Sequence, residues 1–148
     1  MKGKKKGPSG IASRRIESRA ERSEIMARVK GKDTKPEMEI RRLVFGLGYR
    51  FRLHGSSLPG KPDLVFKKKR KVIFIHGCFW HCHSCRAGKN KPKSNTEYWG
   101  PKLKRNKLRD HENQKELKKM GWELLVVWEC DIRDKNKVKT RVLKFLSK

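Results

Sequence analysis

The sequence feature that most constrains this chain is the ten-residue stretch HGCFWHCHSC, residues 76–85. It contains three cysteines and three histidines, which are residue types that bind zinc in proteins. It also contains a phenylalanine followed by a tryptophan, and large aromatic side chains are costly to expose to water. So dense a cluster of cysteine and histidine predicts a metal site in this loop, in preference to ordinary buried cysteines.

The composition indicates one domain with a polyanionic partner. The chain has 148 residues, and its 41 Lys and Arg against 15 Asp and Glu give a formal charge of +26. This excess favours nucleic acid as the partner over an anionic membrane surface. The sequence has no run of eighteen apolar residues, and the N-terminus lacks the apolar segment of a signal peptide. We therefore expect a cytoplasmic protein without membrane contact, in which the cysteines stay reduced.

Two regions are expected along the chain. Residues 1–20 are rich in Lys, Arg, Gly and Ser, which predicts a basic disordered arm. Residues 21–148 are expected to form a single folded domain. In this domain, Thr34 and Glu37 form the pattern of a capping box, which predicts the start of an amphipathic helix that ends near Gly46 and Gly48.

Alternation of Tyr49, Phe51 and Leu53 predicts a strand at residues 49–54, and the strand-like runs at residues 63–66 and 72–77 predict a hairpin. A turn centred near Lys69 would place Asp63 opposite Ile75 and close to His76. We therefore expect a carboxylate and an imidazole at the same edge of the sheet.

The C-terminal third predicts a crossover. Residues 101–120 read as a long polar helix, and WELLVVWEC, residues 122–130, is the most apolar run and reads as a buried strand. A strand, a helix and a second strand in one sheet make the two strands parallel, so Cys130 should lie near Cys78. A short basic amphipathic helix, residues 134–148, is expected to close a mixed α/β fold.

The cysteine-rich edge predicts a closed zinc site. Structural zinc takes four protein ligands in a tetrahedron. We expect these to be Cys78, His83, Cys85 and Cys130. His81 and Cys82 compete for places, because spacing alone does not show which members of the loop point inward. Four protein ligands leave no open position, so this zinc would be structural and not catalytic.

A second, acidic site is expected at the start of the hairpin. Phosphodiester hydrolysis uses a carboxylate to hold magnesium, and Asp63 lies in a suitable place beside His76 and His81. Asp110, on the polar helix, could orient a histidine. For Glu37, the capping box and a role near the metal are equally well supported.

These motifs resemble the very short patch repair (Vsr) family of DNA mismatch endonucleases, which nick DNA at T:G mismatches. The resemblance rests on SLPGKPDLVF, VIFIHGCFWH with its Cys/His continuation, the helix segment from Asn106 to Asp110, and GWELLVVWEC. Their order and spacing match over residues 22–133. The resemblance implies a restriction-endonuclease-like fold: a mixed β-sheet flanked by helices, with a structural zinc site.

The resemblance also implies roles for single residues. Asp63 would bind the catalytic Mg²⁺ together with the backbone carbonyl of Ile75, a position where close relatives often carry threonine. His76 and His81 would be active-site histidines, with His81 as general base and Asp110 as its partner. Glu37 would be an acidic residue near the active site. The zinc ligands would be the same four residues.

The aromatic pair receives a role from the resemblance as well. Phe79 and Trp80 would enter the duplex beside the mismatch, and Met26 would enter from the N-terminal helix. Unstacking a base step costs a few kcal/mol and costs least at a mismatch, so intercalation selects weakened pairs. The alternatives are packing of the aromatic pair over the metal site and ordinary helix packing of Met26.

The implied function is a monomeric, Mg²⁺-dependent endonuclease that acts on double-stranded DNA. It would nick 5′ of the thymine in T:G mismatches that arise when 5-methylcytosine deaminates. The resemblance further implies a mismatch-repair partner protein and a linked cytosine methyltransferase. Two alternatives remain: a related nuclease with another DNA target, and a non-catalytic, zinc-containing nucleic-acid-binding module. The second would leave Asp63, His81 and Asp110 without a shared purpose.

Overall fold

The computed structural model describes residues 18–29 and 31–148. The greater part of the expected arm, residues 1–17, lies outside the described residues. Helix α1 spans Arg19–Arg28, so it begins two residues before the expected start of the folded domain at residue 21. Ser18 caps this helix: its side chain accepts a hydrogen bond from the backbone N–H of Glu21 at 3.1 Å.

The centre of the fold is one four-stranded sheet with strand order β1-β2-β3-β4. The strands are β1 (Arg52–Leu53), β2 (Leu64–Phe66), β3 (Lys71–His76) and β4 (Glu123–Trp128). The pairs β1–β2 and β2–β3 are antiparallel, whereas β3 and β4 are parallel. The expected hairpin and the expected parallel pair are thus confirmed, and they make the sheet mixed.

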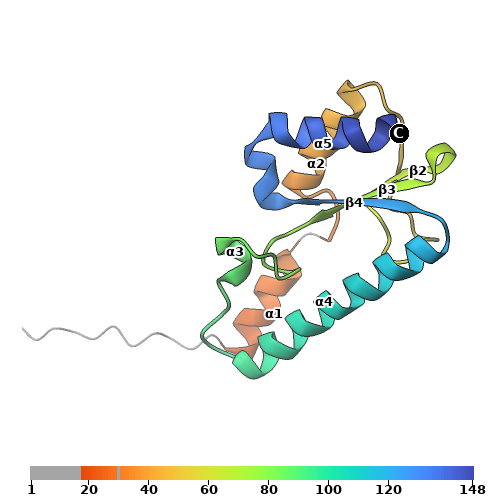
Figure 1. Cartoon of the computed structure of the whole chain (residues 1–148). Coiled ribbons are helices and arrows are strands. Elements are labelled where there is room, and N and C mark those ends of the chain that lie inside the picture. Colours follow the sequence, from red (N-terminus) through yellow and green to blue (C-terminus); the bar gives the residue numbers. More distant parts are fainter. Residues whose placement is uncertain (1–17, 30) are drawn as a thin grey trace, which may run out of the picture.

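Helices cover both faces of this sheet (Figure 1). Helices α2 (Lys35–Gly46) and α5 (Lys135–Ser147) pack on one face, and α4 (Thr96–Lys119) packs on the other. Side chains of β3 alternate between the two layers, as the period of two requires. Ile73 packs in the core beneath α2 and α5, whereas Val72 and Phe74 pack in the second core. Each fully buried side chain of this size contributes about 1.5–3 kcal/mol.

The start of α2 differs in one contact from the expected capping box. The hydroxyl of Thr34 accepts from the backbone N–H of Glu37 at 3.4 Å, as expected. The carboxylate of Glu37, however, accepts from the backbone N–H of Asp33 at 2.9 Å, and it also binds Arg41. The guanidinium draws the carboxylate away from the reciprocal bond, so only half of the box forms. The helix ends at Gly46, and Gly48 follows with φ +89°.

Two expected boundaries were wrong. The strand expected at residues 49–54 has only two paired residues, because Tyr49 and Phe51 pack edge-on against the ring of Phe66 outside the ladder. Helix α4 begins at Thr96, five residues before the expected start. Pro101 lies inside this helix, beyond the first turn, so the hydrogen bond that an N–H at this position would make to the carbonyl of Glu97 is absent.

The remaining elements are short. A 3₁₀ turn η1 (Lys67–Lys69) joins β2 to β3, α3 (Arg86–Lys89) follows the Cys/His loop, and a 3₁₀ turn η2 (Glu129–Arg133) follows β4. Cys130 therefore lies in η2, two residues beyond the strand that was expected to contain it. Among the described residues, no helix is both long enough and apolar enough to cross a membrane.

Candidate active site and metal centre

A cleft of about 910 Å³ opens at the carboxyl end of β3, beside α1 and α4. It brings together most of the residues that the sequence singled out for catalysis and DNA contact. Those that line it are Met26, Glu37, Asp63, Ile75, His76, Trp80, His81 and Asp110. Sequence positions far apart in the chain therefore converge on one concave surface.

Asp63 lies immediately before the first residue of strand β2. Leu64 pairs with Ile73, so the backbone register differs by one residue from the expected one and would place Asp63 opposite Phe74. The side chain nevertheless reaches the expected residue, because its Oδ2 accepts from the backbone N–H of Ile75 at 2.7 Å. Strand β3 extends beyond β2 here, and the carboxylate replaces the missing strand partner. In an antiparallel ladder the N–H and C=O of one residue point to the same side, so the Ile75 carbonyl faces this side too.

The surroundings of Asp63 suit a divalent cation. The pKa of Asp63 is raised to about 6, chiefly by burial and also by nearby Glu37, although the Ile75 N–H, Arg41 and His81 act to lower it. The carboxylate is therefore mainly ionised at neutral pH but poorly solvated. Mg²⁺ prefers carboxylate and carbonyl oxygens and keeps several waters. Asp63 and the Ile75 carbonyl fit such an ion.

The two histidines of the cleft lie face to face. The rings of His76 and His81 are stacked with centroids 3.9 Å apart and an interplanar angle of 6°. Burial, together with the adjacent His81, lowers the pKa of His76 to about 4. His76 is therefore neutral at pH 7.

His81 is oriented by a carboxylate from α4. Its Nδ1 lies 2.5 Å from Oδ2 of Asp110. An ionised carboxylate can only accept, so Nδ1 carries the proton and Nε2 keeps a free lone pair. One turn earlier, Asn106 donates from Nδ2 to the backbone carbonyl of Trp80 at 3.3 Å. The polar face of α4 thus orients the histidine and holds the loop that carries it.

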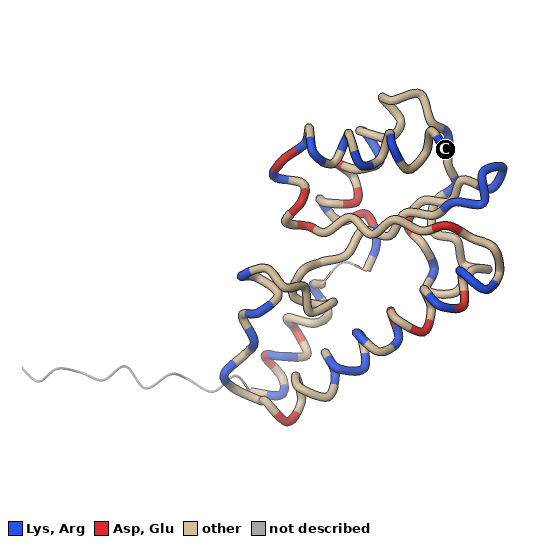
Figure 2. The backbone as a smooth tube through the Cα atoms, in the orientation of Figure 1, with Lys and Arg blue, Asp and Glu red and all other residues tan. Residues whose placement is uncertain are grey.

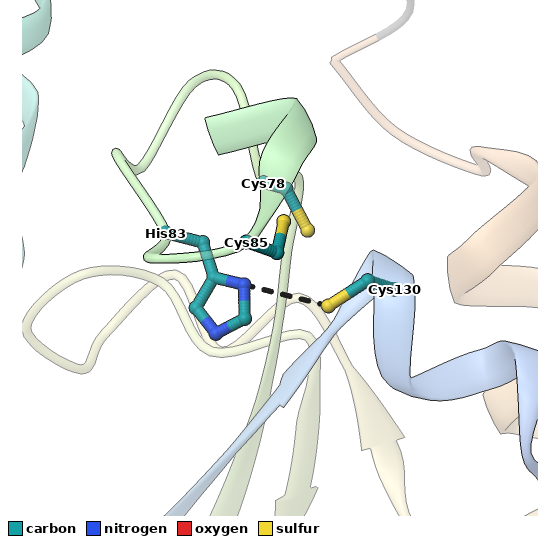
Figure 3. A group of neighbouring side chains, drawn as sticks. All are labelled: Cys78, His83, Cys85 and Cys130. Carbon is teal, nitrogen blue, oxygen red and sulfur yellow. Dashed lines mark hydrogen bonds between the residues drawn. The ribbon is translucent and has the colours of Figure 1, made fainter. Parts of the chain in front are cut away.

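The four residues expected to bind zinc form one cluster (Figure 3). The ligand atoms of Cys78, His83, Cys85 and Cys130 all lie within 4.8 Å of one another, and His83 Nδ1 lies 3.4 Å from Cys130 Sγ. Zinc bonds of about 2.0–2.3 Å in a tetrahedron separate neighbouring ligand atoms by about 3.5–4 Å, so this donor set fits zinc. The two competing residues point elsewhere: His81 binds Asp110, and Cys82 Sγ approaches the Leu103 carbonyl at 3.8 Å.

The thiols of this cluster differ in acidity. Burial raises the pKa of Cys78 to about 12 and also raises that of Cys130. The backbone N–H of Gly88, followed by His83, lowers the pKa of Cys85 to about 6. Gly88 also has no room for a side chain, because an added Cβ would lie 2.0 Å from the His83 carbonyl oxygen. The short helix α3 therefore has to pass this close to form the cluster.

The aromatic pair belongs to a larger aromatic group. Phe79 and Trp80 are partly buried and lie 5.6 Å and 5.8 Å from the ring of Trp99 at the start of α4. Tyr98 lies 5.1 Å from the same ring. Trp99 was not predicted as a functional residue, because the helix was expected to begin at Pro101. The dipeptide Tyr98-Trp99, following the basic segment at residues 86–93, was the available signal.

Basic side chains accompany the cleft. Lys102 and Arg109 of α4 line it, and Lys and Arg recur along the rest of α4 and in the β2–β3 turn (Figure 2). Phosphate groups of a nucleic-acid backbone are attracted to such a surface.

Comparison with known proteins identifies the family. Residues 15–87 match the family model of the DNA mismatch endonuclease Vsr. The type II nicking enzyme V.XorIIP of Xanthomonas oryzae pv. oryzae is 45% identical over 122 residues, which are 82% of this chain and 89% of that enzyme. The DNA mismatch endonuclease Vsr of Escherichia coli is 40% identical over 128 residues, which are 86% of this chain and 81% of that enzyme.

A solved structure supports the fold. The catalytic domain of the homing endonuclease I-Bth0305I superimposes with a TM-score of 0.53 at 19% identity, covering 76% of this chain and 94% of that domain. The expected restriction-endonuclease-like class, a mixed sheet flanked by helices, is thus confirmed. Fold and relatives together define a DNA-cleaving hydrolase that acts as a nicking endonuclease. The chain belongs to the Vsr family of DNA mismatch endonucleases.

Proposed function

We propose that this enzyme nicks one DNA strand on the 5′ side of the thymine in a T:G mismatch, the lesion left when 5-methylcytosine deaminates. Membership of the Vsr family supports the mismatch as the target. The observation that carries the proposed hydrolysis is the His81–Asp110 pair, which lines the same cleft as Asp63.

We assign the metal-binding role to Asp63 and to the backbone carbonyl of Ile75. When bound, Mg²⁺ would stabilise the charge that develops on the phosphate and would acidify an attacking water. Glu37 lines the cleft next to Asp63 and is assigned to the same acidic group. The chain itself supplies the oxygen ligands and a partly desolvated place for them.

We assign proton transfer to His81. Its Nε2 accepts the proton of the attacking water, since Nδ1 is already engaged with Asp110. The carboxylate of Asp110 keeps the ring in this tautomer and stabilises the imidazolium that forms. His76, stacked on His81 and neutral, shields the ring from water without competing for the proton.

We assign mismatch recognition to Phe79 and Trp80, together with Met26 of α1, which lines the same cleft as Trp80. These aromatic side chains are only partly buried, and they lie in the loop that also carries Cys78, His83 and Cys85. A zinc ion bound to these residues and Cys130 would fix the loop, so that the aromatic pair keeps its shape while it separates a base step. A mismatched pair is the one that costs least to unstack.

The test uses duplexes labelled on one strand, with T:G, C:G or T:A at one position in several sequence contexts. Purified protein with Mg²⁺ should nick beside the thymine of T:G, and Asp63→Ala should bind DNA without cutting it. Glu112→Ala, which removes an exposed carboxylate elsewhere on α4, is the matched control and should cut normally. Cutting that ignores the mismatch would indicate a nuclease with another target. Equal cutting by Asp63→Ala would exclude the proposed site.

We also propose that the enzyme acts as a monomer in the cytoplasm and cooperates with a mismatch-repair protein. A cytosine methyltransferase that creates the vulnerable 5-methylcytosine would be its functional counterpart. Support for these assignments comes from the family. Size-exclusion chromatography with light scattering at several concentrations tests the monomer.

A further inference from the structure

A buried arginine at the edge of the cleft connects three ionisable side chains. Arg41 of α2 is 9% exposed. Its Nη1 lies 2.6 Å from Asp33 Oδ1, and its Nη2 lies 3.0 Å from Glu37 Oε2. The same Nη2 lies 3.2 Å from His54 Nε2. The guanidinium thus occupies the centre of the group formed by Asp33, Glu37 and His54.

This group is attached directly to the backbone of the active site. His54 donates its backbone N–H to the carbonyl of Asp63 at 3.1 Å. A guanidinium can only donate, so His54 Nε2 accepts from Arg41 and the ring proton resides on Nδ1. Arg41 therefore ties helix α2 to the chain segment that pairs with Asp63.

The carboxylate of Glu37 is held through one oxygen only. Oε2 accepts from the backbone N–H of Asp33 at 2.9 Å and from Arg41. Oε1 has no hydrogen bond to any other residue in the described part of the chain. Glu37 lines the cleft with Asp63 and is close enough to influence its charge. Two bonds thus fix the side chain and leave the second oxygen available to the cleft.

We propose that Arg41 is a positioning residue of the active site, which holds Glu37 so that Oε1 faces the water shell of a divalent cation at Asp63. This inference rests on the proposed roles of Asp63 and Glu37. A glutamate side chain has three rotatable bonds, and fixing it before the metal binds removes an entropic cost from binding. The positive charge of Arg41 also offsets the repulsion between two carboxylates that face the same cleft.

Stability alone does not account for this arrangement. Burying an arginine carries a desolvation cost, and Nε of Arg41 is buried without a hydrogen-bond partner in the described residues. Well-packed apolar residues often replace a buried ion pair without loss of stability. A function in the adjacent cleft explains why the guanidinium is present.

The experiment uses three single variants, Arg41→Lys, Asp33→Asn and Glu37→Gln. It compares them with two double variants, in which Arg41→Lys or Asp33→Asn is combined with Glu37→Gln. Arg42→Lys, at the exposed next position of the same helix, is the matched control. Nicking of a T:G duplex is measured against Mg²⁺ concentration, so that half-saturation and maximal rate are separated. Mn²⁺ binding to the protein without DNA is measured by electron paramagnetic resonance, with Asp63→Ala as the blank. Thermal melting verifies that each variant is folded.

We expect Arg41→Lys to raise the Mg²⁺ half-saturation and to weaken Mn²⁺ binding by about 10-fold, the range found when partners of metal-site residues are removed. The maximal rate at saturating Mg²⁺ should change much less. Asp33→Asn should give a smaller shift in the same direction. Neither change should have a further effect in the Glu37→Gln background, because Arg41 acts through Glu37. Arg42→Lys should behave like the parent.

Specific results would overturn the inference. If the shift in Mg²⁺ half-saturation caused by Arg41→Lys added fully to the shift caused by Glu37→Gln, Arg41 would not act through this carboxylate. Unchanged Mg²⁺ dependence would leave Arg41 a structural residue. If Glu37→Gln behaved like the parent while Asp63→Ala lost activity, the inference about Arg41 would be refuted and the proposed active site would stand. If Asp63→Ala remained active, the proposed active site itself would be refuted. If Arg41→Lys does not fold, Asp33→Asn decides, because its side chain is 64% exposed.

Discussion

Replacing Asp110 by asparagine tests the proton-transfer role of His81 most directly. In the parent protein, the 2.5 Å contact fixes the ring proton on Nδ1 and directs the lone pair of Nε2 to the cleft. An asparagine fits the same space but carries no charge. Its amide can donate to Nδ1, which would move the ring proton to Nε2 and remove the acceptor.

The magnitude follows from the geometry. Two unit charges 4 Å apart interact by about 4 kcal/mol at an effective dielectric constant near 20. The side chains of His81 and Asp110 are 25% and 18% exposed, so water screens part of this energy. Taking about half leaves ~2 kcal/mol of imidazolium stabilisation, or a factor of about 30 in rate. The tautomer change acts in the same direction, and proton-transfer catalysis is worth about 10²–10⁴-fold in total. We therefore expect a loss of about 10²–10³-fold.

Single-turnover nicking of a T:G duplex with excess enzyme and saturating Mg²⁺ measures this step. DNA affinity, measured in Ca²⁺, should stay within about threefold of the parent, because the carboxylate of Asp110 is engaged with His81. His81→Gln should be as slow as Asp110→Asn, and the double variant should be no slower than either. Glu112→Gln, at an exposed position of α4, is the control for the loss of a carboxylate charge. A nicking rate for Asp110→Asn within threefold of the parent would refute the reasoning.

Three further predictions concern the metal cluster and the acidic site. Cys130→Ser should abolish stoichiometric zinc binding, detected by metal analysis, and should lower the melting temperature, because it removes the ligand that ties the loop to η2. Retention of one zinc per chain would contradict this. Gly88→Ala should have a similar effect, since its Cβ would meet the His83 carbonyl, whereas Gly100→Ala, with nothing within 4 Å, should leave zinc and stability intact. Asp63→Asn should abolish nicking and stabilise the metal-free protein at pH 7 in urea titrations. Burial raises the pKa of Asp63 from 3.8 to about 6, so the folded parent loses stability as the pH rises through this window, by at most about 3 kcal/mol. The gain in stability of Asp63→Asn over the parent should therefore vanish near pH 4. An equal gain at pH 4 and pH 7 would show that the burial of an ionised carboxylate is not its cause.

Much of the fold could be predicted because the hydrophobic pattern fixes it locally. The unbroken apolar run at residues 72–75 is typical of a strand with two buried faces, and the long helix between two such strands makes them parallel. The meeting of Cys78 and Cys130 followed from that topology. The helix start at Thr96 could not be predicted, because proline is typical of a first turn and Pro101 therefore suggested the wrong boundary.

Site residues could be predicted where the residue type and its neighbours in the sequence indicate a function. They could not be predicted where the residue type is common in its sequence context. Asp63 was placed near Ile75 despite a register that differs by one residue, since the side chain spans the difference. Arg41 gave no signal, because one arginine in a basic helix is typical of a solvated face. Only the tertiary structure shows that it is buried among two carboxylates and an imidazole. Contacts between a helix and a distant strand are not encoded in local pattern.

The order of residues in the Cys/His loop has a consequence for how the enzyme fails. Cys78 precedes Phe79, Trp80 and His81 in the sequence, and His83 and Cys85 follow them. The residues that would contact DNA or transfer the proton therefore lie between residues that would bind zinc. Loss of zinc would release Phe79, Trp80 and His81 together. Target selection and cutting would then disappear in one event, so a damaged copy would become inert and would not degenerate into an indiscriminate nuclease. For an enzyme that breaks DNA, this coupling would prevent uncontrolled cutting after loss of the metal.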